Sequence, residues 1–258
     1  MGRLFIIVII LAMLTAPGMS MMKASSSGSE DQIVLNLYLN SIDDAFDECK
    51  DKMRDLIKTK YLEKELNDHY DFGKDWEKAK SFLKLEGKSD DELRKLALSA
   101  YTGHVFEDLN TKMRSGRKHY MTTFGLISLH FLITDGIQHL NPNNKCQTTY
   151  RFGSDKYVIK GDKIRFGSFA SSSRNPDLSL FGRVTCFIIE TCFGADISVL
   201  SPSKIEAEVL IPPYEVFNNV YLSEKEIPKE LSDCRQVYKL KSTKVKKNNM
   251  NCELLNMI

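Results

Sequence analysis

The sequence lacks the motifs that mark several common enzyme and metal-binding classes. Its six cysteines lie far apart, with no CxxC pair and no Cys/His cluster at metal-ligand spacing, which argues against a structural zinc site. No GxGxxG, P-loop, HExxH or GxSxG sequence is present, so Rossmann, nucleoside-triphosphatase, zincin and α/β-hydrolase interpretations have no support. All five histidines precede residue 140, away from the strand-like second half, and this disfavours a histidine-based nucleophilic site.

The sequence also lacks an excess of charge of either sign. Lys and Arg (36) nearly balance Asp and Glu (34), so a nucleic-acid partner is disfavoured. The Lys-rich stretch 239–247 is better explained as a solvated edge. No Asn-x-Ser/Thr sequon occurs, so an N-linked glycan is not expected. With 258 residues, of which 42% are hydrophobic, the chain can fold into one large or two small globular domains.

The first 24 residues have the composition of a secretory signal peptide. Arg3 supplies the positive start, residues 4–14 are uninterruptedly apolar, and residues 16–24 offer small side chains for cleavage. This apolar run is too short for a membrane span, which needs roughly 20 residues. The chain ends without the hydrophobic tail of a lipid anchor. We therefore expect a secreted, extracellular protein without a stable membrane anchor, cleaved after Ser20 or Ala24.

Residues 41–140 have the apolar spacing of helices. Ser41 with Asp44 resembles a capping box at a helix start, and Ser89 with Glu92 repeats this signal more clearly. Helices are expected after Ser41, around Trp76, after Ser89 and over 124–140.

Beyond residue 144 the pattern changes to short runs rich in Val, Ile, Phe, Thr and Tyr, broken by Gly, Pro and Asn. The expected strands are 148–152, 163–172, 184–191, 195–200, 206–211, 219–222 and 237–243. Helices first and strands later indicate an α+β fold rather than a parallel doubly wound sheet. No Pro/Gly linker separates the halves, so we expect one domain over 25–258, helical at 41–140 and β-rich at 147–258.

Three elements of the strand-rich half carry polar groups that could do chemistry. Arg151 lies inside a β-like run, although an isolated strand arginine is usually a surface residue. Residues 171–173 are consecutive serines after an alternating strand, a pattern that alone is typical of a strand end. Glu206 and Glu208 begin the run 206–211. If that run is extended, both carboxylates point to the same side.

The Glu-x-Glu pair has two interpretations. Two carboxylates this close repel each other, so the pair costs stability unless a cation or hydrogen bonds compensate. Such pairs serve acid-base and oxocarbenium chemistry, as in glycoside cleavage, where one carboxylate stabilises positive charge at the anomeric carbon. On spacing alone, two solvated glutamates at a strand start explain the pattern equally well.

Arginine on one strand, Ser-Ser-Ser on the next, and Glu-x-Glu before Val-Leu-Ile-Pro-Pro together resemble the R-S-E signature of the vertebrate ecto-mono-ADP-ribosyltransferases, relatives of the cholera-toxin-like toxins. The resemblance extends over nearly the whole mature chain. It includes residues 43–49, 76–80, 100–102, 165–173, 191–195, 208–217 and 251–252. It implies a helical N-terminal part packed on a mixed β-core in two sheets around an NAD cleft, with NAD as substrate and no metal.

The resemblance implies a role for each residue of the signature. Arg151 would hold NAD through its phosphates, and Ser171 would orient the glutamate and the nicotinamide ribose. Glu208 would stabilise the oxocarbenium-like transition state as nicotinamide leaves. Glu206 would position and partly deprotonate the acceptor guanidinium, which is a poor nucleophile because its pKa lies far above neutral. The implied activity is transfer of ADP-ribose from NAD to arginine side chains of extracellular proteins.

Tyr101, Ser168 and Ser201 are weaker candidates for NAD contact. The sequence departs from the family pattern twice, since Phe152 stands where the family usually has Gly directly after the arginine, and Ser168 stands where Gln is common. Two alternatives therefore stay open beside the transferase. One is an NAD glycohydrolase, which ends the same reaction with water, and the other is an inactive extracellular binding module of the same fold.

The cysteines agree with this family pattern. It implies two disulfides, Cys49–Cys252 and Cys146–Cys192. Each would close a long loop and stabilise the folded protein by roughly 3 to 5 kcal/mol, because it restricts the unfolded chain. Cys186 and Cys234 are left over, and they could form a third bridge or stay as buried thiols.

Overall fold

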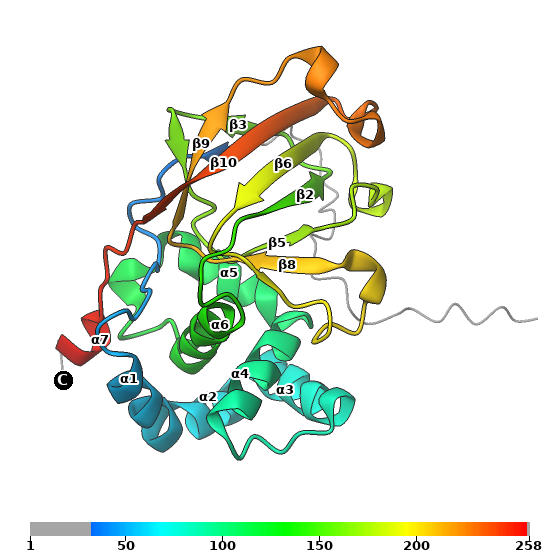
Figure 1. The fold of residues 1–258 in the computed structure, drawn as a ribbon. Helices are drawn as coiled ribbons and strands as arrows, with labels where there is room; N and C mark the ends of the chain where they lie inside the picture. The colour runs from blue at the N-terminus through cyan, green and yellow to red at the C-terminus, as the bar shows by residue number, and fades with distance from the viewer. Residues whose placement is uncertain (1–31, 257–258) are drawn as a thin grey trace, which may run out of the picture.

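The computed structural model describes residues 32–256. The expected signal peptide, residues 1–24, lies outside the described residues. Figure 1 shows two layers, with helices at the bottom and a twisted β-sheet above them. No helix of this described part is long and apolar enough to cross a membrane.

The helices lie in the first half of the chain, apart from one short turn at its end. They are α1 (Lys50–Leu56), a π-helical segment (Ile57–Tyr61), α2 (Leu62–Asp68), α3 (Tyr70–Leu83), α4 (Asp90–Tyr101), α5 (Val105–Ser115), α6 (Ile127–Leu140) and α7 (Glu253–Asn256). Short 3-10 turns join several of these elements and lie between the later strands. The helical region expected from the apolar spacing is therefore present.

Two helix starts follow from local hydrogen bonding. Ser89 caps α4 as the sequence predicts, and its hydroxyl accepts a hydrogen bond from the backbone N–H of Glu92 at 3.2 Å. The last expected helix begins three residues late, at Ile127, because Gly125 turns the chain with φ +66°. The carboxylate of Glu65, on α2, accepts the backbone N–H of Ile127 at 2.8 Å and so replaces a local cap.

The capping box expected at Ser41 and Asp44 is wrong, because the first helix begins only at Lys50. The Asp44 carboxylate is buried and accepts hydrogen bonds from the backbone N–H groups of Phe46 and Cys252, both at 2.8 Å. A side chain that resembles a helix cap thus joins the beginning of the domain to its end.

The strands form an eight-stranded mixed sheet and a two-stranded sheet. The large sheet contains, in spatial order, β4 (Lys163–Ile164), β9 (Glu215–Val220), β10 (Gln236–Lys246), β6 (Thr185–Thr191), β2 (Gln147–Gly153), β5 (Ala170–Ser173), β8 (Glu208–Ile211) and β7 (Ala195–Asp196). In the small sheet, β1 (Ile33–Leu35) runs parallel to β3 (Tyr157–Ile159). The described residues pair β2 with β5 at one position, Tyr150 with Ser173, so the large sheet divides at this junction.

Several strands are shorter than the sequence pattern suggests. The run 163–172 is divided between two strands, because Gly167 adopts φ +72° and turns the chain. The runs 195–200 and 206–211 are extended only over Ala195–Asp196 and Glu208–Ile211. Strands β1 and β3 have no counterpart among the expected strands, and each is only three residues long.

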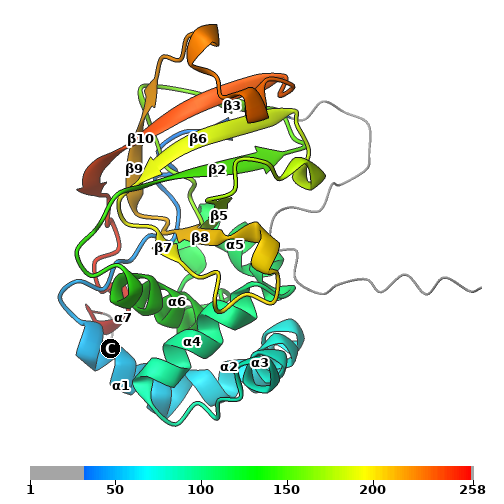
Figure 2. The ribbon, with the colours of Figure 1, turned by 45° about the vertical axis from the view of Figure 1, so that its right-hand side comes forward.

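The two layers share a hydrophobic core. The helical core also includes Phe169, Ile197 and Leu210 from the strand half, so the helices pack on the part of the sheet around β8 and β7. Figure 2 shows α4 and α6 directly beneath these strands. A second core, which includes Tyr157 and Phe187, fills the space between the small sheet and the upper part of the large one. The α+β fold class, a helical part packed on a mixed β-core in two sheets, is confirmed.

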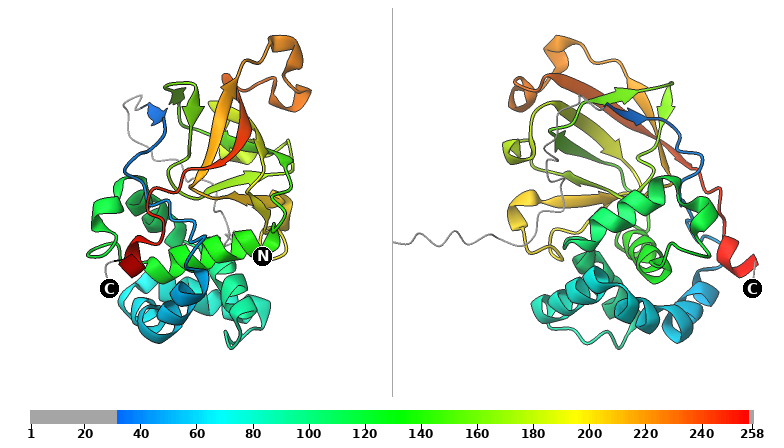
Figure 3. Two further views of the ribbon diagram at one scale, coloured as in Figure 1. Left: turned by 60° about the vertical axis from the view of Figure 1, so that its left-hand side comes forward. Right: turned by 180° about the vertical axis from the view of Figure 1, so that it is seen from behind.

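Three disulfides fasten the chain. They are Cys49–Cys252, Cys146–Cys192 and Cys186–Cys234, and no cysteine of the described residues is free. The first two pairs confirm the prediction, and the third resolves the pairing that the sequence left open. The Cys49–Cys252 disulfide joins the residues directly before α1 and α7. Figure 3 shows α7 lying beside α1 in both views.

Candidate functional site

The position of Arg151 follows from the alternation of β2. The Arg151 side chain is buried, and its Nη1 donates a hydrogen bond to the backbone oxygen of Ser171 on β5 at 2.5 Å. Its neighbour Phe152 lies in a separate apolar cluster that includes Phe181 and Cys186. Successive side chains of a strand point to opposite faces, so the ring at the family's usual glycine position points away from Arg151.

Tyr101 connects the helical layer to the same place. Its hydroxyl, at the end of α4, accepts a hydrogen bond from Asn110 Nδ2 at 3.0 Å and donates one to the backbone oxygen of Phe169 at 3.5 Å. Burial raises the pKa of Tyr101 to about 12, and the hydrogen bonds from Asn110 and Ser171 lower it in part. The phenol therefore stays protonated at neutral pH and can act as a hydrogen-bond donor.

Glu208 completes this group. It is the first residue of β8, where it pairs with Ser173 of β5, and its side chain is fully buried. Its charge is one of the influences that raise the pKa of Tyr101, while the charge of Arg151 lowers that pKa. Arg151, Ser171, Tyr101 and Glu208, four of the residues predicted for the site, therefore lie together.

Glu206 differs from the sequence expectation. It ends the 3-10 turn Lys204–Glu206 rather than starting a strand, and Ala207 has the left-handed conformation φ +41°, ψ +49°. The premise that both carboxylates point to the same side of one extended strand is therefore wrong. The turn arises because the backbone oxygen of Glu206 accepts the hydroxyl of Ser173 at 2.5 Å, which holds the chain against β5.

The Glu206 carboxylate is buried but incompletely hydrogen-bonded. Its side chain is 2% exposed, and its Oε2 has no hydrogen-bond partner among the atoms of the described chain. Burial raises the pKa of Glu206, and the hydroxyl of Ser203 lowers it in part. A sheltered carboxylate with a raised pKa and an open acceptor position is suited to take a hydrogen bond, or a proton, from an incoming group.

The two remaining predicted serines have different surroundings. Ser168 is buried, donates a hydrogen bond to the backbone oxygen of Phe169 at 3.2 Å, and lines a cavity together with Arg151. Ser201 is also buried, and its hydroxyl accepts the backbone N–H of Ser203 at 3.2 Å. Ser201 thus supports the segment before Glu206, which is the local packing role weighed for it from sequence.

The cavity beside Arg151 has a volume of about 270 Å³. Its walls are mainly aromatic and aliphatic, and its charged lining residues are Arg151 and Arg114. Arg114 and Asn110, the hydrogen-bond partner of Tyr101, were not among the site residues predicted from the sequence. Both are on α5 and four residues apart, so they share one face of the helix. The four-residue spacing in the sequence predicts that the two side chains share a helix face, but it does not show which part of the protein that face contacts.

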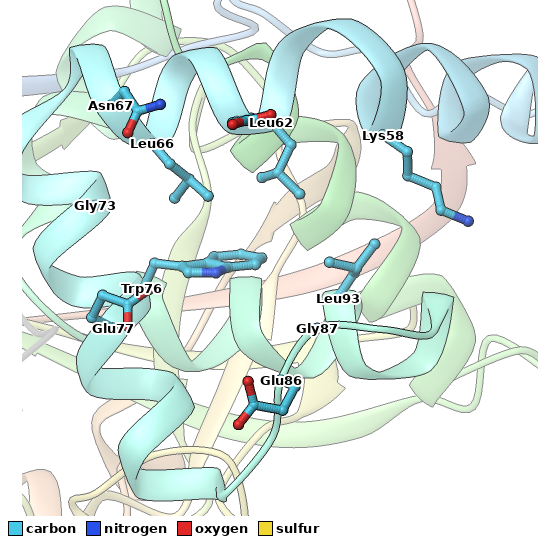
Figure 4. A pocket seen from close by; sticks show the side chains of 11 residues that line it. Lys58, Leu62, Leu66, Asn67, Gly73, Trp76, Glu77, Glu86, Gly87 and Leu93 are labelled. Carbon is cyan, nitrogen blue, oxygen red and sulfur yellow. The ribbon is translucent and has the colours of Figure 1, made fainter.

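A second hollow, in the helical layer, has a different character. It has a volume of about 510 Å³ and lies between α2, α3 and the segment before α4. Figure 4 shows the Trp76 indole at its centre, with Leu62, Leu66 and Leu93 around it. Three glutamates also line it, and its lysine, Lys58, already pairs with Asp90 at 2.6 Å. Such a lining repels an anionic dinucleotide, and the hollow contains none of the predicted site residues.

Within residues 32–256, no group of three or more His, Cys, Asp or Glu side chains could hold a metal ion. The chemical groups that the structure brings together are thus two buried carboxylates, a buried arginine, a protonated tyrosine and serine hydroxyls. The arginine of this set can bind an anion, and the carboxylates can stabilise a developing positive charge.

Comparison with known proteins agrees with this geometry. The family described as NAD:arginine ADP-ribosyltransferase matches residues 35–233. T-cell ecto-ADP-ribosyltransferase 1 of Mus musculus is 33% identical over 239 residues, covering 85% of this chain and 77% of that protein. NAD(P)(+)--arginine ADP-ribosyltransferase 2 of Gallus gallus is 29% identical over 238 residues, covering 86% of this chain and 73% of that protein.

Solved structures give the same result. The crystal structure of the eucaryotic mono-ADP-ribosyltransferase ART2.2 superimposes with a TM-score of 0.72 at 28% identity, covering 85% of this chain and 98% of that one. A mutant of ART2.2 in complex with NAD has a TM-score of 0.73 with the same coverage. The sequence match, the shared fold and the clustered signature lead to one conclusion: the chain belongs to the NAD:arginine ADP-ribosyltransferase family.

Proposed function

We propose that the protein is a secreted mono-ADP-ribosyltransferase that transfers ADP-ribose from NAD to arginine side chains of extracellular proteins. The observation that carries this proposal is the meeting of Arg151, Ser171 and Glu208 where β2 and β5 diverge, with Glu206 on the adjoining turn. The names of the relatives describe ecto-enzymes, which supports a location outside the cell.

The reaction follows from the two carboxylates. The bond from the ribose anomeric carbon to nicotinamide breaks, and nicotinamide leaves with the bonding electrons. Glu208 accepts a hydrogen bond from the ribose and stabilises the oxocarbenium-like transition state. A guanidine nitrogen of the acceptor then forms the new bond to the anomeric carbon. The proton that this nitrogen loses goes to Glu206, whose Oε2 has room for a donor.

Ser171 and Tyr101 act as positioning groups in this scheme. Ser171 is held by Arg151 at its backbone oxygen and lies against the Tyr101 hydroxyl, so the strand that carries it has little freedom. Such fixed donors need no reorganisation as charge develops. The structure also weakens the main argument for an inactive binding module, since the Phe152 ring packs with Phe181 and Cys186 rather than beside Arg151.

The test separates transfer from hydrolysis. Purified mature protein is incubated with labelled NAD and agmatine, and the label is counted separately in ADP-ribosyl-agmatine and in free ADP-ribose. We expect Glu208→Gln to lose both products by about 100-fold or more. We expect Glu206→Gln to lose transfer but to keep a measurable part of the hydrolysis, because its carboxylate serves the acceptor. Glu224→Gln, at an exposed residue of the 3-10 turn Glu224–Glu226, is the matched control.

Each outcome separates one alternative from the others. Free ADP-ribose without labelled agmatine in the unmodified protein would establish an NAD glycohydrolase. Equal loss of both products in Glu206→Gln would contradict the division of roles between the two carboxylates. No consumption of NAD at all would overturn the enzyme proposal in favour of a binding module.

A further inference from the structure

The helical layer contains a hollow that the proposed reaction does not use. It has a volume of about 510 Å³ and lies between α2, α3 and the segment before α4. Trp76 lies at its centre and is 4% exposed. In Figure 4, Leu62 and Leu66 lie above the indole, and Glu77 and Glu86 lie below it. The hollow therefore offers an aromatic ring with an apolar wall on one side and carboxylates on the other.

The indole N–H of Trp76 is a donor that the protein does not use. Among residues 32–256 it has no hydrogen-bond acceptor, although the ring is held in an edge contact by Phe72, with 5.7 Å between the ring centroids. Figure 4 shows the nitrogen on the edge of the ring that faces the carboxylates. A tryptophan that is removed from water usually has a partner for its N–H. The hollow thus presents a fixed donor to a ligand with an acceptor oxygen, such as a peptide carbonyl.

The ionisable side chains of the hollow give it a negative charge. Its lysine, Lys58, already pairs with Asp90 at 2.6 Å. One glutamate contacts Lys80 at 3.4 Å, whereas the other two form no ion pair with any residue that the structure describes. A cation in the hollow would be attracted both by these carboxylates and by the face of the indole. The three glutamates, all exposed at the rim, are Glu63, Glu77 and Glu86.

The walls of the hollow are fixed before any ligand binds. The loop that carries one of its glutamates turns at Gly87 with φ +78°, and the backbone N–H groups of Gly87 and Lys88 donate to the Glu92 carboxylate at 2.8 and 2.9 Å. On α3, a Cβ at Gly73 would lie 2.4 Å from the backbone oxygen of Leu66, so the absence of a side chain lets α2 and α3 approach closely. Such fixed walls lower the entropic cost of binding.

Helix α3 connects the hollow to the turn that carries Glu206. The ammonium of Lys204, on that turn, lies 5.4 Å from the ring centroid of Phe82, close to the C-terminal end of α3. Trp76 precedes Phe82 by six residues, a rise of about 9 Å along the helix. An acceptor protein is much larger than this separation, so one that presents an arginine to Glu206 can also contact the hollow.

We propose that the hollow is a docking site for a second basic side chain, lysine or arginine, of the acceptor protein. This inference rests on the proposed function, because it needs an acceptor that brings an arginine to Glu206. The basic side chain lies against the Trp76 ring and pairs with Glu63 and Glu86. The indole N–H donates to a backbone carbonyl of the same segment. The hollow therefore selects acceptors in which the modified arginine has basic neighbours.

The binding experiment uses Trp76 as its own reporter, because it is the only tryptophan in the sequence. Its fluorescence is titrated, without NAD, with the acetylated and amidated peptide Gly-Lys-Gly-Arg-Gly and with a matched peptide that has Gln in both basic positions. We expect saturable binding of the basic peptide alone. The double variant Glu63→Gln with Glu86→Gln should weaken it by about 3- to 10-fold, as expected for two partly exposed ion pairs. Glu224→Gln is the control and should bind the peptide as the unmodified protein does.

The kinetic experiment separates docking from a structural effect. The acceptors are agmatine and two peptides of about 15 residues with one central arginine, flanked either by lysines or by glutamines. We expect the double variant to raise KM by about 3- to 10-fold for the lysine peptide alone. For agmatine and the glutamine peptide, KM and kcat should stay within about twofold, because neither places a basic side chain in the hollow while its guanidinium reacts.

Three results would count against these proposals in different ways. Equal binding of the basic and the glutamine peptide would overturn the inference, because the hollow would then not recognise a cation. An equal rise in KM for all three acceptors would also overturn it, because the substitutions would then act on the whole fold. Absence of transfer to agmatine by the unmodified protein would instead reject the proposed function, which the docking experiment by itself does not test.

Discussion

At the scale of single residues, the two glutamates of the Glu-x-Glu motif have different surroundings. Glu208 is the first residue of β8, between β5 and β7, and its charge raises the pKa of Tyr101. Glu206 is on a turn, with a raised pKa and an open acceptor oxygen. This difference in backbone position, a strand start for Glu208 and a turn for Glu206, is the basis for assigning Glu208 to the sugar and Glu206 to the acceptor.

The raised pKa of Glu206 gives a prediction about pH. Glu206 must be ionised to take the guanidinium proton, so transfer to agmatine should fall on acidification at a pH above the ordinary glutamate value of 4.5. NAD hydrolysis does not need this proton transfer and should persist to lower pH. The measurement is kcat/KM for both products between pH 4 and pH 8. Identical pH profiles for the two products would contradict the assignment.

At the scale of elements, the turn before β8 decides where Glu206 lies. Ala207 is left-handed at φ +41°, a conformation that costs a non-glycine residue roughly 1 to 2 kcal/mol. The hydrogen bond from Ser173 to the backbone oxygen of Glu206 at 2.5 Å maintains this turn against the strain. The backbone N–H of Arg174 also donates a hydrogen bond to the oxygen of Ala207 at 3.1 Å, so β5 and its following residue hold the turn that carries Glu206.

This strain predicts different effects on stability for two substitutions at residue 207. Ala207→Gly should leave stability within about 1 kcal/mol of the original, because relief of strain is offset by greater freedom of the unfolded chain. Ala207→Val should cost about 1 to 3 kcal/mol and lower the ratio of transfer to hydrolysis, because a branched side chain opposes this conformation. Urea unfolding and product counting test both. Equal stability of the two variants would contradict the strain argument.

At the scale of the whole molecule, buried carboxylates near the beginning of the domain hold its two ends together. Asp43 and Arg165 form a fully buried ion pair at 2.6 Å, and Asp43 also accepts the backbone N–H of Asn249 at 3.0 Å. The neighbouring Asp44 accepts the backbone N–H of Cys252, next to the disulfide that closes the domain. The first and last segments of the domain are therefore fixed beside each other, close to the Arg165-Phe166-Gly167 turn that leads into β5.

Asp44 also predicts how stability depends on pH. Burial raises its pKa from 3.8 to about 6, so the folded protein binds the proton more tightly than the unfolded chain. The stability that Asp44 contributes is complete below pH 3.8 and is lost as pH rises to about 6, by at most about 3 kcal/mol. The free energy of unfolding of Asp44→Asn, measured in guanidinium between pH 4 and pH 7, should lack this loss. Parallel pH curves for the two proteins would refute the prediction.

Much of the architecture could be predicted from the sequence, because it depends on local periodicity and on residue order. The helix-then-strand pattern gave the fold class, Ser89 gave the start of α4, and the ordered Arg, Ser and Glu elements gave the family. The strand assignment was least accurate at β1 and β3, whose three-residue lengths leave no periodic signal, and after Gly167, where a positive φ interrupts an apparently continuous strand.

The sequence by itself determined which chemical groups are available, since Arg151, Ser171, Glu206 and Glu208 are identified by their order and spacing. Only the tertiary structure decided how these groups are arranged. Periodicity cannot reveal that Ala207 is left-handed or which apolar cluster receives the Phe152 ring, because both depend on contacts with distant segments. The same holds for the third disulfide and for the face of α5 that lies against the site, because residues far apart in the chain become neighbours only when the layers pack.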